Sequence, residues 1–125
     1  SGQPPAGSAV LVVESNEPVR VALAEALRSL GYPVETAADA AGALERLRAE
    51  PGRFGVALVD LALPQMGGRG LARAAQGVTP GLPVLLLTAH ALDDDPQALR
   101  RDQIVDWLQK PIDLDRLEAA VKAAL

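Results

Sequence analysis

Residues 56–68 read VALVDLALPQMGG, and this stretch decides the fold that the sequence predicts. An apolar run leads into a carboxylate at Asp60, and loop residues, Pro64 among them, follow. A short apolar run bounded by turn residues is typical of a strand covered on both faces, as in parallel sheets. The pattern predicts a buried strand over residues 54–59 that ends at Asp60, followed by a long loop and a short helix.

Four further strands are predicted on either side of this stretch. Three are short, mainly apolar runs at residues 10–13, 84–87 and 104–108, and the fourth is a short strand at residues 32–36. Segments with helical spacing of apolar residues follow the strands at 17–30, 39–51 and 113–125, where Asn16, Asp39 and Asp113 are placed as N-terminal caps. The segment 90–103 has the weakest helical pattern. Strand and helix alternate five times, which predicts an α/β fold with a doubly wound parallel sheet and helices on both faces.

Composition restricts the classes of protein to which the chain can belong. Its 125 residues, 49% of them hydrophobic, suffice for one domain, which we place at residues 9–125. Residues 1–8 are expected to be a flexible linker or a cloning remnant. The absence of cysteine excludes disulfides and thiolate metal sites, and no apolar run could span a membrane. A net charge of -4 without a basic cluster argues against direct nucleic-acid binding, and we expect a cytoplasmic protein.

Polar residues gather where the predicted strands end. Glu14 and Ser15 follow the first strand, Asp60 the third, Thr88 the fourth and Lys110 the fifth. Ligands of open parallel sheets bind beyond these carboxyl ends. Two neighbouring carboxylates favour a hard cation such as Mg²⁺, and a lysine balances an added anion. The edge is equipped to accept a phosphoryl group on Asp60.

Four segments resemble, in order, the receiver domains of bacterial two-component signalling. They are VLVVESNEPVR (10–20), VALVDLALPQMGG (56–68), LLLTAH (85–90) and WLQKPIDLDRL (107–117). The resemblance implies a flavodoxin-like five-stranded sheet with strand order 2-1-3-4-5. It also implies a role for each matching residue. Asp60 is the phosphoacceptor, Thr88 the switching hydroxyl, Lys110 its cationic partner and Trp107 an aromatic switch, with a cis peptide before Pro111.

Magnesium is the cofactor that the resemblance implies. Glu14, Asp60 and the backbone carbonyl of Ala62 would hold it. Ser15 stands where the family has a second acid, so we expect a lower Mg²⁺ affinity, by roughly a few kcal/mol at a protein surface. Glu14, one methylene longer than aspartate, is not expected to compensate fully. Ala62 and His90 stand at positions that tune the phosphoryl lifetime in the family, and we assign His90 no other chemistry.

Two charged runs near the fourth predicted helix need an interpretation of their own. Residues 100–103 read RRDQ, where the family has small residues and a glycine, so the preceding helix is expected to be shifted or frayed. Residues 93–95 are three aspartates that lack the ligand spacing of a calcium loop. We expect them to supply negative charge at a helix N-terminus.

The resemblance implies a phosphotransfer module. Its donor would be a histidine kinase or a phosphotransfer domain, its reader an output domain or partner protein, and its only catalysis its own phosphorylation and dephosphorylation. We expect the domain to come from a hybrid sensor kinase, attached behind other domains, and a stand-alone regulator is the alternative. The alternative is a degenerate pseudo-receiver that signals through protein contacts alone, which Ser15 favours. A flavin-binding protein of the same fold is disfavoured, because no hydroxyl-rich phosphate loop follows the first strand.

Overall fold

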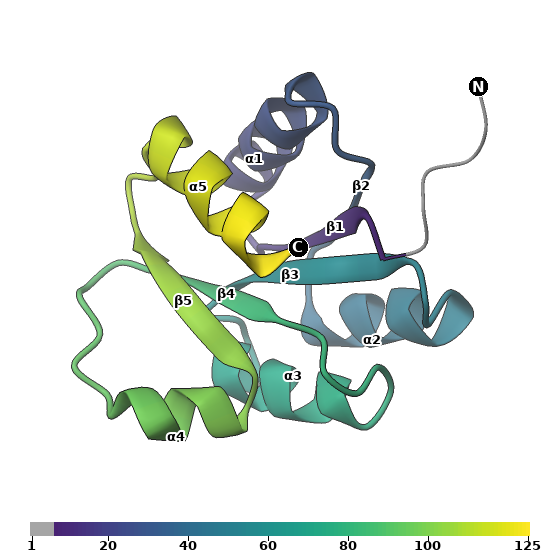
Figure 1. The fold of residues 1–125 in the computed structure, drawn as a ribbon, viewed down its shortest axis with the longest axis vertical. Helices are drawn as coiled ribbons and strands as arrows, with labels where there is room; N and C mark the ends of the chain where they lie inside the picture. Colours follow the sequence, from purple (N-terminus) through teal and green to yellow (C-terminus); the bar gives the residue numbers. More distant parts are fainter. Residues whose placement is uncertain (1–6) are drawn as a thin grey trace.

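Five parallel strands form one sheet in the order β2-β1-β3-β4-β5 (Figure 1). The structure is a computed structural model that describes residues 7–125, so most of the segment expected to be a linker lies outside the described residues. The strands are β1 (Ala9–Val13), β2 (Val34–Ala37), β3 (Phe54–Asp60), β4 (Val84–Thr88) and β5 (Ile104–Gln109). The predicted parallel sheet and its strand order are confirmed.

Helices cover both faces of this sheet, as predicted. They are α1 (Glu17–Ser29), α2 (Ala40–Ala49), α3 (Gly67–Gln76), α4 (Pro96–Arg101) and α5 (Leu114–Ala124). In Figure 1, α1 and α5 lie on one side of the sheet and α2, α3 and α4 on the other. Their side chains pack into two separate buried clusters, one on each face. Because helices cover both faces of the sheet, polar residues of the strands reach the surface at the strand ends.

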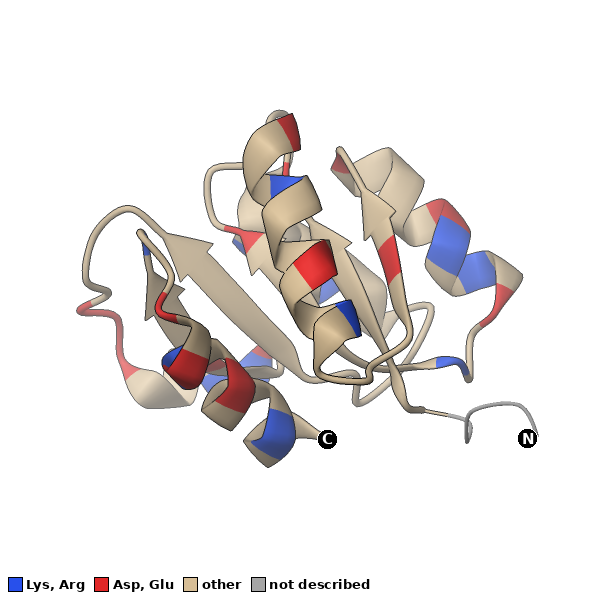
Figure 2. Ribbon diagram, turned by 90° about the horizontal axis from the view of Figure 1, so that it is seen from above, with Lys and Arg blue, Asp and Glu red and all other residues tan. Residues whose placement is uncertain are grey.

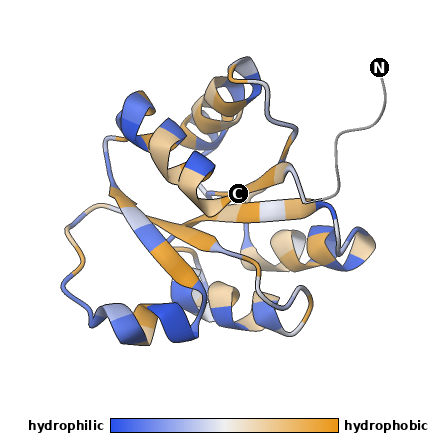
Figure 3. Ribbon diagram, in the orientation of Figure 1, coloured by the Kyte–Doolittle hydropathy of each residue, from blue (hydrophilic) through white to orange (hydrophobic). Residues whose placement is uncertain are grey.

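The two strands that flank β3, β1 and β4, are buried along their whole length. Every residue of β1 and of β4 is buried, and successive residues of β1 alternate between the two clusters. This double burial explains why these strands read as unbroken apolar runs, which appear as hydrophobic colour in the middle of Figure 3. Charged residues lie mainly on the helices and loops in Figure 2.

Three helices begin at the predicted caps. The side chain of Asn16 accepts the N–H of Val19 at 3.1 Å, and that of Asp39 accepts the N–H of Gly42 at 2.8 Å. Asp113 caps α5 in the same way. Each cap satisfies a backbone donor that the first helical turn leaves without a partner, and so fixes where the chain turns from the sheet edge into a helix.

The predicted boundaries were wrong in three places. Strand β2 begins at Val34, because Tyr32 is still tied to α1 through its N–H and the carbonyl of Leu27, 3.2 Å apart. Helix α3 has 10 residues, as many as α2, and is not short. Helix α4 has only 6 residues, because Pro96 fits only in the first turn of a helix. The expectation that this helix is shifted or frayed relative to the family stays a prediction.

Candidate functional site

Three charged side chains meet at the carboxyl ends of β1, β3 and β5. Lys110 Nζ lies 2.7 Å from Glu14 Oε1 and 3.5 Å from Asp60 Oδ2. Glu14 is 1% exposed and the Asp60 side chain 9%, whereas the Lys110 side chain is 29% exposed. Burial acts to lower the pKa of Lys110, but the hydrogen bond and charge of Glu14, and then Asp60, raise it overall. The site is a buried acidic pair with one ammonium group.

Both carboxylates of this pair also accept backbone hydrogen bonds. Glu14 Oε2 accepts the N–H of Asn16 at 3.2 Å, and Asp60 Oδ1 accepts the N–H of Ala62 at 3.1 Å. Over residues 7–125, every buried polar side-chain atom has a hydrogen-bond partner. Glu14 is therefore held from two sides, by Lys110 and by the loop that follows β1, so the longer side chain does not project freely into the site.

Arg20 organises the loop that carries Ser15, a role that the sequence analysis missed. Its guanidinium Nη1 donates to the carbonyl of Glu14 at 2.9 Å and lies 3.5 Å from that of Ser15. The Ser15 side chain is exposed. The place of Arg20 in the first turns of α1, shortly after the Asn16 cap, was the only signal available, and such a residue is usually a solvated helix residue.

The hydroxyl of Thr88 is engaged with the loop after β4. Thr88 is 3% exposed, and its Oγ1 donates to the carbonyl of His90 at 2.8 Å and accepts the N–H of His90 at 3.1 Å. No hydrogen bond joins Thr88 to Asp60 in the part of the chain that is described. The strand order places Thr88 beside the site, while its hydroxyl points into the local turn. His90 itself is exposed.

Trp107 lies within β5, before Lys110 in the chain, and is partly buried. It packs against the buried cluster on the α3 and α4 side of the sheet and pairs with Leu86 in the sheet register. A cavity of about 220 Å³ between β5 and α4 is lined by Trp107, Leu99 and their neighbours. The side chain is thus in contact with the core and at the edge of a surface hollow, which suits both a packing role and the predicted switch.

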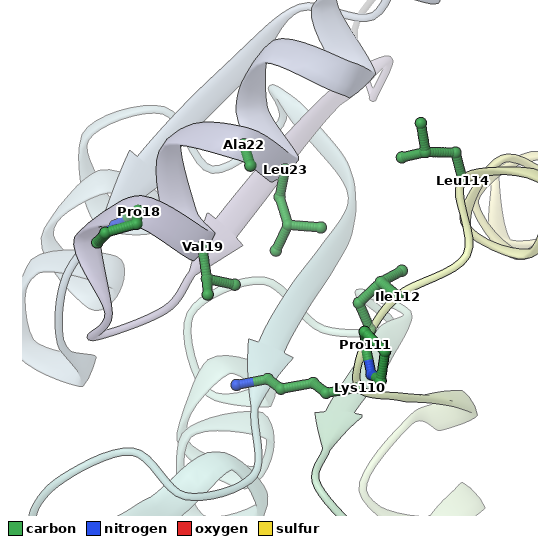
Figure 4. A pocket seen from close by; sticks show the side chains of 8 residues that line it. All are labelled: Pro18, Val19, Ala22, Leu23, Lys110, Pro111, Ile112 and Leu114. Atoms are coloured by element: carbon green, nitrogen blue, oxygen red, sulfur yellow. The ribbon is translucent and has the colours of Figure 1, made fainter.

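An apolar groove of about 600 Å³ borders the charged site (Figure 4). Its wall on one side is the first half of α1, and its wall on the other is the loop that runs from the cis peptide between Lys110 and Pro111 into α5. The residues that line it are Pro18, Val19, Ala22, Leu23, Lys110, Pro111, Ile112 and Leu114. Lys110 thus belongs to both the groove and the ion pair, so the two form one continuous surface feature. The sequence analysis missed this groove.

The oxygen donors of the site suit a magnesium ion but are few. Among residues 7–125 there is no group of three or more His, Cys, Asp or Glu side chains that could hold a metal. Two carboxylates, Glu14 and Asp60, and the backbone carbonyl of Ala62 are hard ligands, and Mg²⁺ in proteins often has only one or two carboxylates and several waters. The residues fit the ion, with one acid fewer than the resemblance implies.

Comparison with known proteins identifies the family. The sequence pattern of the response regulator receiver domain matches residues 10–122. The chain belongs to this family. A solved structure of the chemotaxis protein CheY4 of Vibrio cholerae superposes with a TM-score of 0.85 at 29% identity, over 96% of this chain and all of that one. The receiver fold and the resemblance stated from the four motifs are therefore confirmed.

Longer relatives place receiver domains in different settings. A response regulator receiver protein of Anaeromyxobacter sp. (strain Fw109-5) is 35% identical over 86% of this chain and 44% of its own length. The transcriptional regulatory protein GlrR of Escherichia coli (strain K12) is 34% identical over 93% of this chain and 26% of its own. The sensor kinase CckA of Brucella abortus is 33% identical over 95% of this chain and 13% of its own length. The chain therefore spans less than half of each of these relatives. No helix among the described residues is long and apolar enough to cross a membrane.

Proposed function

We propose that this receiver domain accepts a phosphoryl group on Asp60 from a histidine kinase or phosphotransfer domain. The observation that carries the proposal is the position of Lys110 Nζ, 3.5 Å from Asp60 Oδ2 at the mouth of the site. A carboxylate oxygen of Asp60 would attack phosphorus, the P–N bond to the donor imidazole would break, and the imidazole would take up a proton. Lys110 lowers the cost of this step by offsetting the negative charge that arrives.

The chain offers further groups for the phosphorylated state. Thr88 would leave the carbonyl of His90 and donate its hydroxyl hydrogen to the new phosphoryl oxygen, and Trp107 would change its packing in response. Magnesium, held by Glu14, Asp60 and the Ala62 carbonyl, would supply charge neutralisation when bound. Ser15 is exposed and carries no charge with which to attract Mg²⁺. Lys110 would therefore neutralise a larger share of the phosphoryl charge than in a domain that has an acid at this position.

The apolar groove is the proposed docking surface for the phosphodonor protein. A donor histidine has to reach Asp60 from outside, and the groove begins at Lys110, which contacts Asp60. The lining, apolar apart from Lys110, suits the apolar face of an amphipathic helix of a donor protein. Leu114 is 59% exposed and offers an apolar side chain that a bound partner would remove from water. We further propose a cytoplasmic protein in which this domain is joined to sensor or output domains.

Phosphorylation of Asp60 is tested with the purified domain, acetyl phosphate and Mg²⁺. Intact-mass spectrometry is expected to show one added phosphoryl group that is absent in Asp60→Asn. If the parent domain gains no mass and beryllofluoride with Mg²⁺ causes no spectral change, Asp60 is not a phosphoacceptor. That result would favour the phosphorylation-independent interaction module, for which the neutral Ser15 is the motivating residue.

The docking surface is tested by Leu114→Asp, with Leu30→Asp as the matched control. Both leucines are exposed, and Leu30 lies at the far end of α1. Leu114→Asp is expected to slow transfer from a phosphorylated donor protein far more than labelling by acetyl phosphate, which needs no protein surface. Equal effects of the two substitutions on the ratio of these rates would refute docking in the groove.

A further inference from the structure

Two arginines one helical turn apart on α3 reach the segment that contains α4. Arg69 forms an ion pair with Asp94, in the loop before α4. Arg73 donates from Nε to Asp102 Oδ1 at 3.2 Å and from Nη2 to Asp102 Oδ2 at 3.1 Å. Asp102 is the residue at the C-terminal end of α4. Both ends of α4 are thus tied to the same face of α3.

The second of these pairs buries a carboxylate. Asp102 is 8% exposed, while the Arg73 side chain, 70% exposed, lies over it from the solvent side. The hydrogen bond from Arg73, followed by its charge and that of Arg69, lowers the pKa of Asp102 against the opposing effect of burial. A buried carboxylate without its partner is costly, so the ion pair fixes the position of the chain at Asp102.

The first turn of α3, which carries Arg69, also rests on the backbone of Asp60. The N–H of Gly68 donates to the carbonyl of Leu61 at 2.9 Å. A Cβ atom at Gly68 would lie 2.5 Å from the carbonyl oxygen of Asp60, so only glycine permits this approach. Helix α3 therefore contacts the acceptor residue at its N-terminus and the α4 segment through Arg69 and Arg73.

Apart from these two ion pairs, α4 is held by its packing against β5. It comprises 6 residues, and Leu99 is its buried residue. A helix of this length is not stable alone, because too few hydrogen bonds offset the ordering of its backbone. Its conformation consequently depends on contacts with the rest of the domain, among them those at its ends, where the two aspartates meet α3. Figure 1 shows α3 and α4 side by side beneath the sheet.

We propose that the ion pairs Arg69–Asp94 and Arg73–Asp102 couple the backbone of Asp60 to α4 through α3. A displacement at the acceptor moves the first turn of α3, and the two arginines pass that displacement to both ends of α4. The use of this coupling in signalling rests on the proposed phosphorylation of Asp60, but the coupling itself is a property of the unmodified domain.

Amide hydrogen exchange of residues 97–101 tests the coupling in four proteins. They are the parent, Asp60→Asn, Arg69→Gln/Arg73→Gln, and the triple variant. The double variant is expected to speed exchange in α4 roughly three- to tenfold. Asp60→Asn is expected to change α4 exchange in the parent background and to do so by less than half as much in the double-variant background. Arg46→Gln, which breaks the 2.8 Å pair with Glu35 between α2 and β2, is the control and should leave α4 unchanged.

Two results would overturn the coupling. One is unchanged α4 exchange in the double variant, and the other is an effect of Asp60→Asn that is absent or the same in both backgrounds. None of these measurements requires phosphorylation. Adding beryllofluoride and Mg²⁺ to the parent then tests the proposed function separately, through exchange at residues 88–90. The coupling can therefore stand where the phosphoacceptor role fails, and the reverse also holds.

Discussion

The ammonium group of Lys110 lies 2.7 Å from Oε1 of Glu14, a carboxylate that is 1% exposed. These residues are 96 positions apart in sequence, so the contact joins the carboxyl end of the first strand to that of the last. It compensates a buried negative charge within the protein itself. Lys110 therefore contributes to the stability of the resting domain as well as to the proposed chemistry.

Lys110→Met is expected to lower the free energy of unfolding by about 1–3 kcal/mol, because Glu14 loses its counter-ion while the apolar stem is kept. Urea unfolding at neutral pH measures the change. Lys122→Met is the control, since Lys122 Nζ lies 3.9 Å from Glu118 in an exposed pair, and it should have an effect below about 0.5 kcal/mol. Equal effects of the two substitutions would show that Glu14 does not depend on Lys110.

Ser15→Asp is expected to tighten Mg²⁺ binding by about tenfold or more, because a second loop carboxylate adds attraction to the cation. Calorimetric titration of the domain with MgCl₂ measures the affinity directly. Ser15→Asn has the same size without the charge and should bind Mg²⁺ within about twofold of the parent. If the aspartate and asparagine variants bind alike, charge at position 15 does not limit the site.

The stability contributed by Asp102 should depend on pH in the acid range. Its pKa is lowered from 3.8 by the hydrogen bond from Arg73, so the pair contributes fully above that value. The contribution is lost as pH falls through the lowered value in the folded state. Asp102→Asn is expected to be about 1 kcal/mol less stable than the parent at pH 7, with the difference shrinking below pH 3.8. Urea unfolding at several pH values measures it, and a constant difference would contradict the assignment.

Two glycines of α3 give a matched pair of substitutions. A Cβ at Gly68 would lie 2.5 Å from the carbonyl oxygen of Asp60, whereas one at Gly70 would lie 3.2 Å from the Cβ of Met66, a tight contact that a much smaller shift relieves. Gly68→Ala is expected to destabilise the domain by about 1–3 kcal/mol, because backbone has to move. Gly70→Ala should be neutral or stabilising by up to about 1 kcal/mol from helix propensity. Thermal unfolding compares them, and equal stabilities would argue against close packing of α3 on Asp60.

The sheet and the members of the site could be predicted because they leave local signals. Burial on both faces makes β1 and β4 continuous apolar runs, and the residue that ends each parallel strand reaches the same edge. Asp60, Glu14 and Lys110 were placed by this logic, and the structure brings them within hydrogen-bond or ion-pair distance.

Contacts between distant segments could not be predicted in this way. Arg73 and Asp102 are 29 positions apart, and each resembles an ordinary charged surface residue in the sequence. The groove beside Lys110 arises from the packing of α1 against the loop before α5, which no single segment encodes. The start of α4 has a local signal in Pro96, whereas the contact of Asp102 with Arg73 at its end is not encoded in the segment's own apolar pattern.

Ser15 also bears on how such a domain changes over evolutionary time. The five residues of β1 are all buried, whereas Ser15, two positions beyond the end of that strand, has an exposed side chain. Substitutions in the strand are therefore constrained by packing, while position 15 is free to vary without a penalty to folding. A lineage could gain or lose dependence on a divalent cation through this one codon, and the same scaffold could move between a phosphorylated switch and a constitutive binding partner.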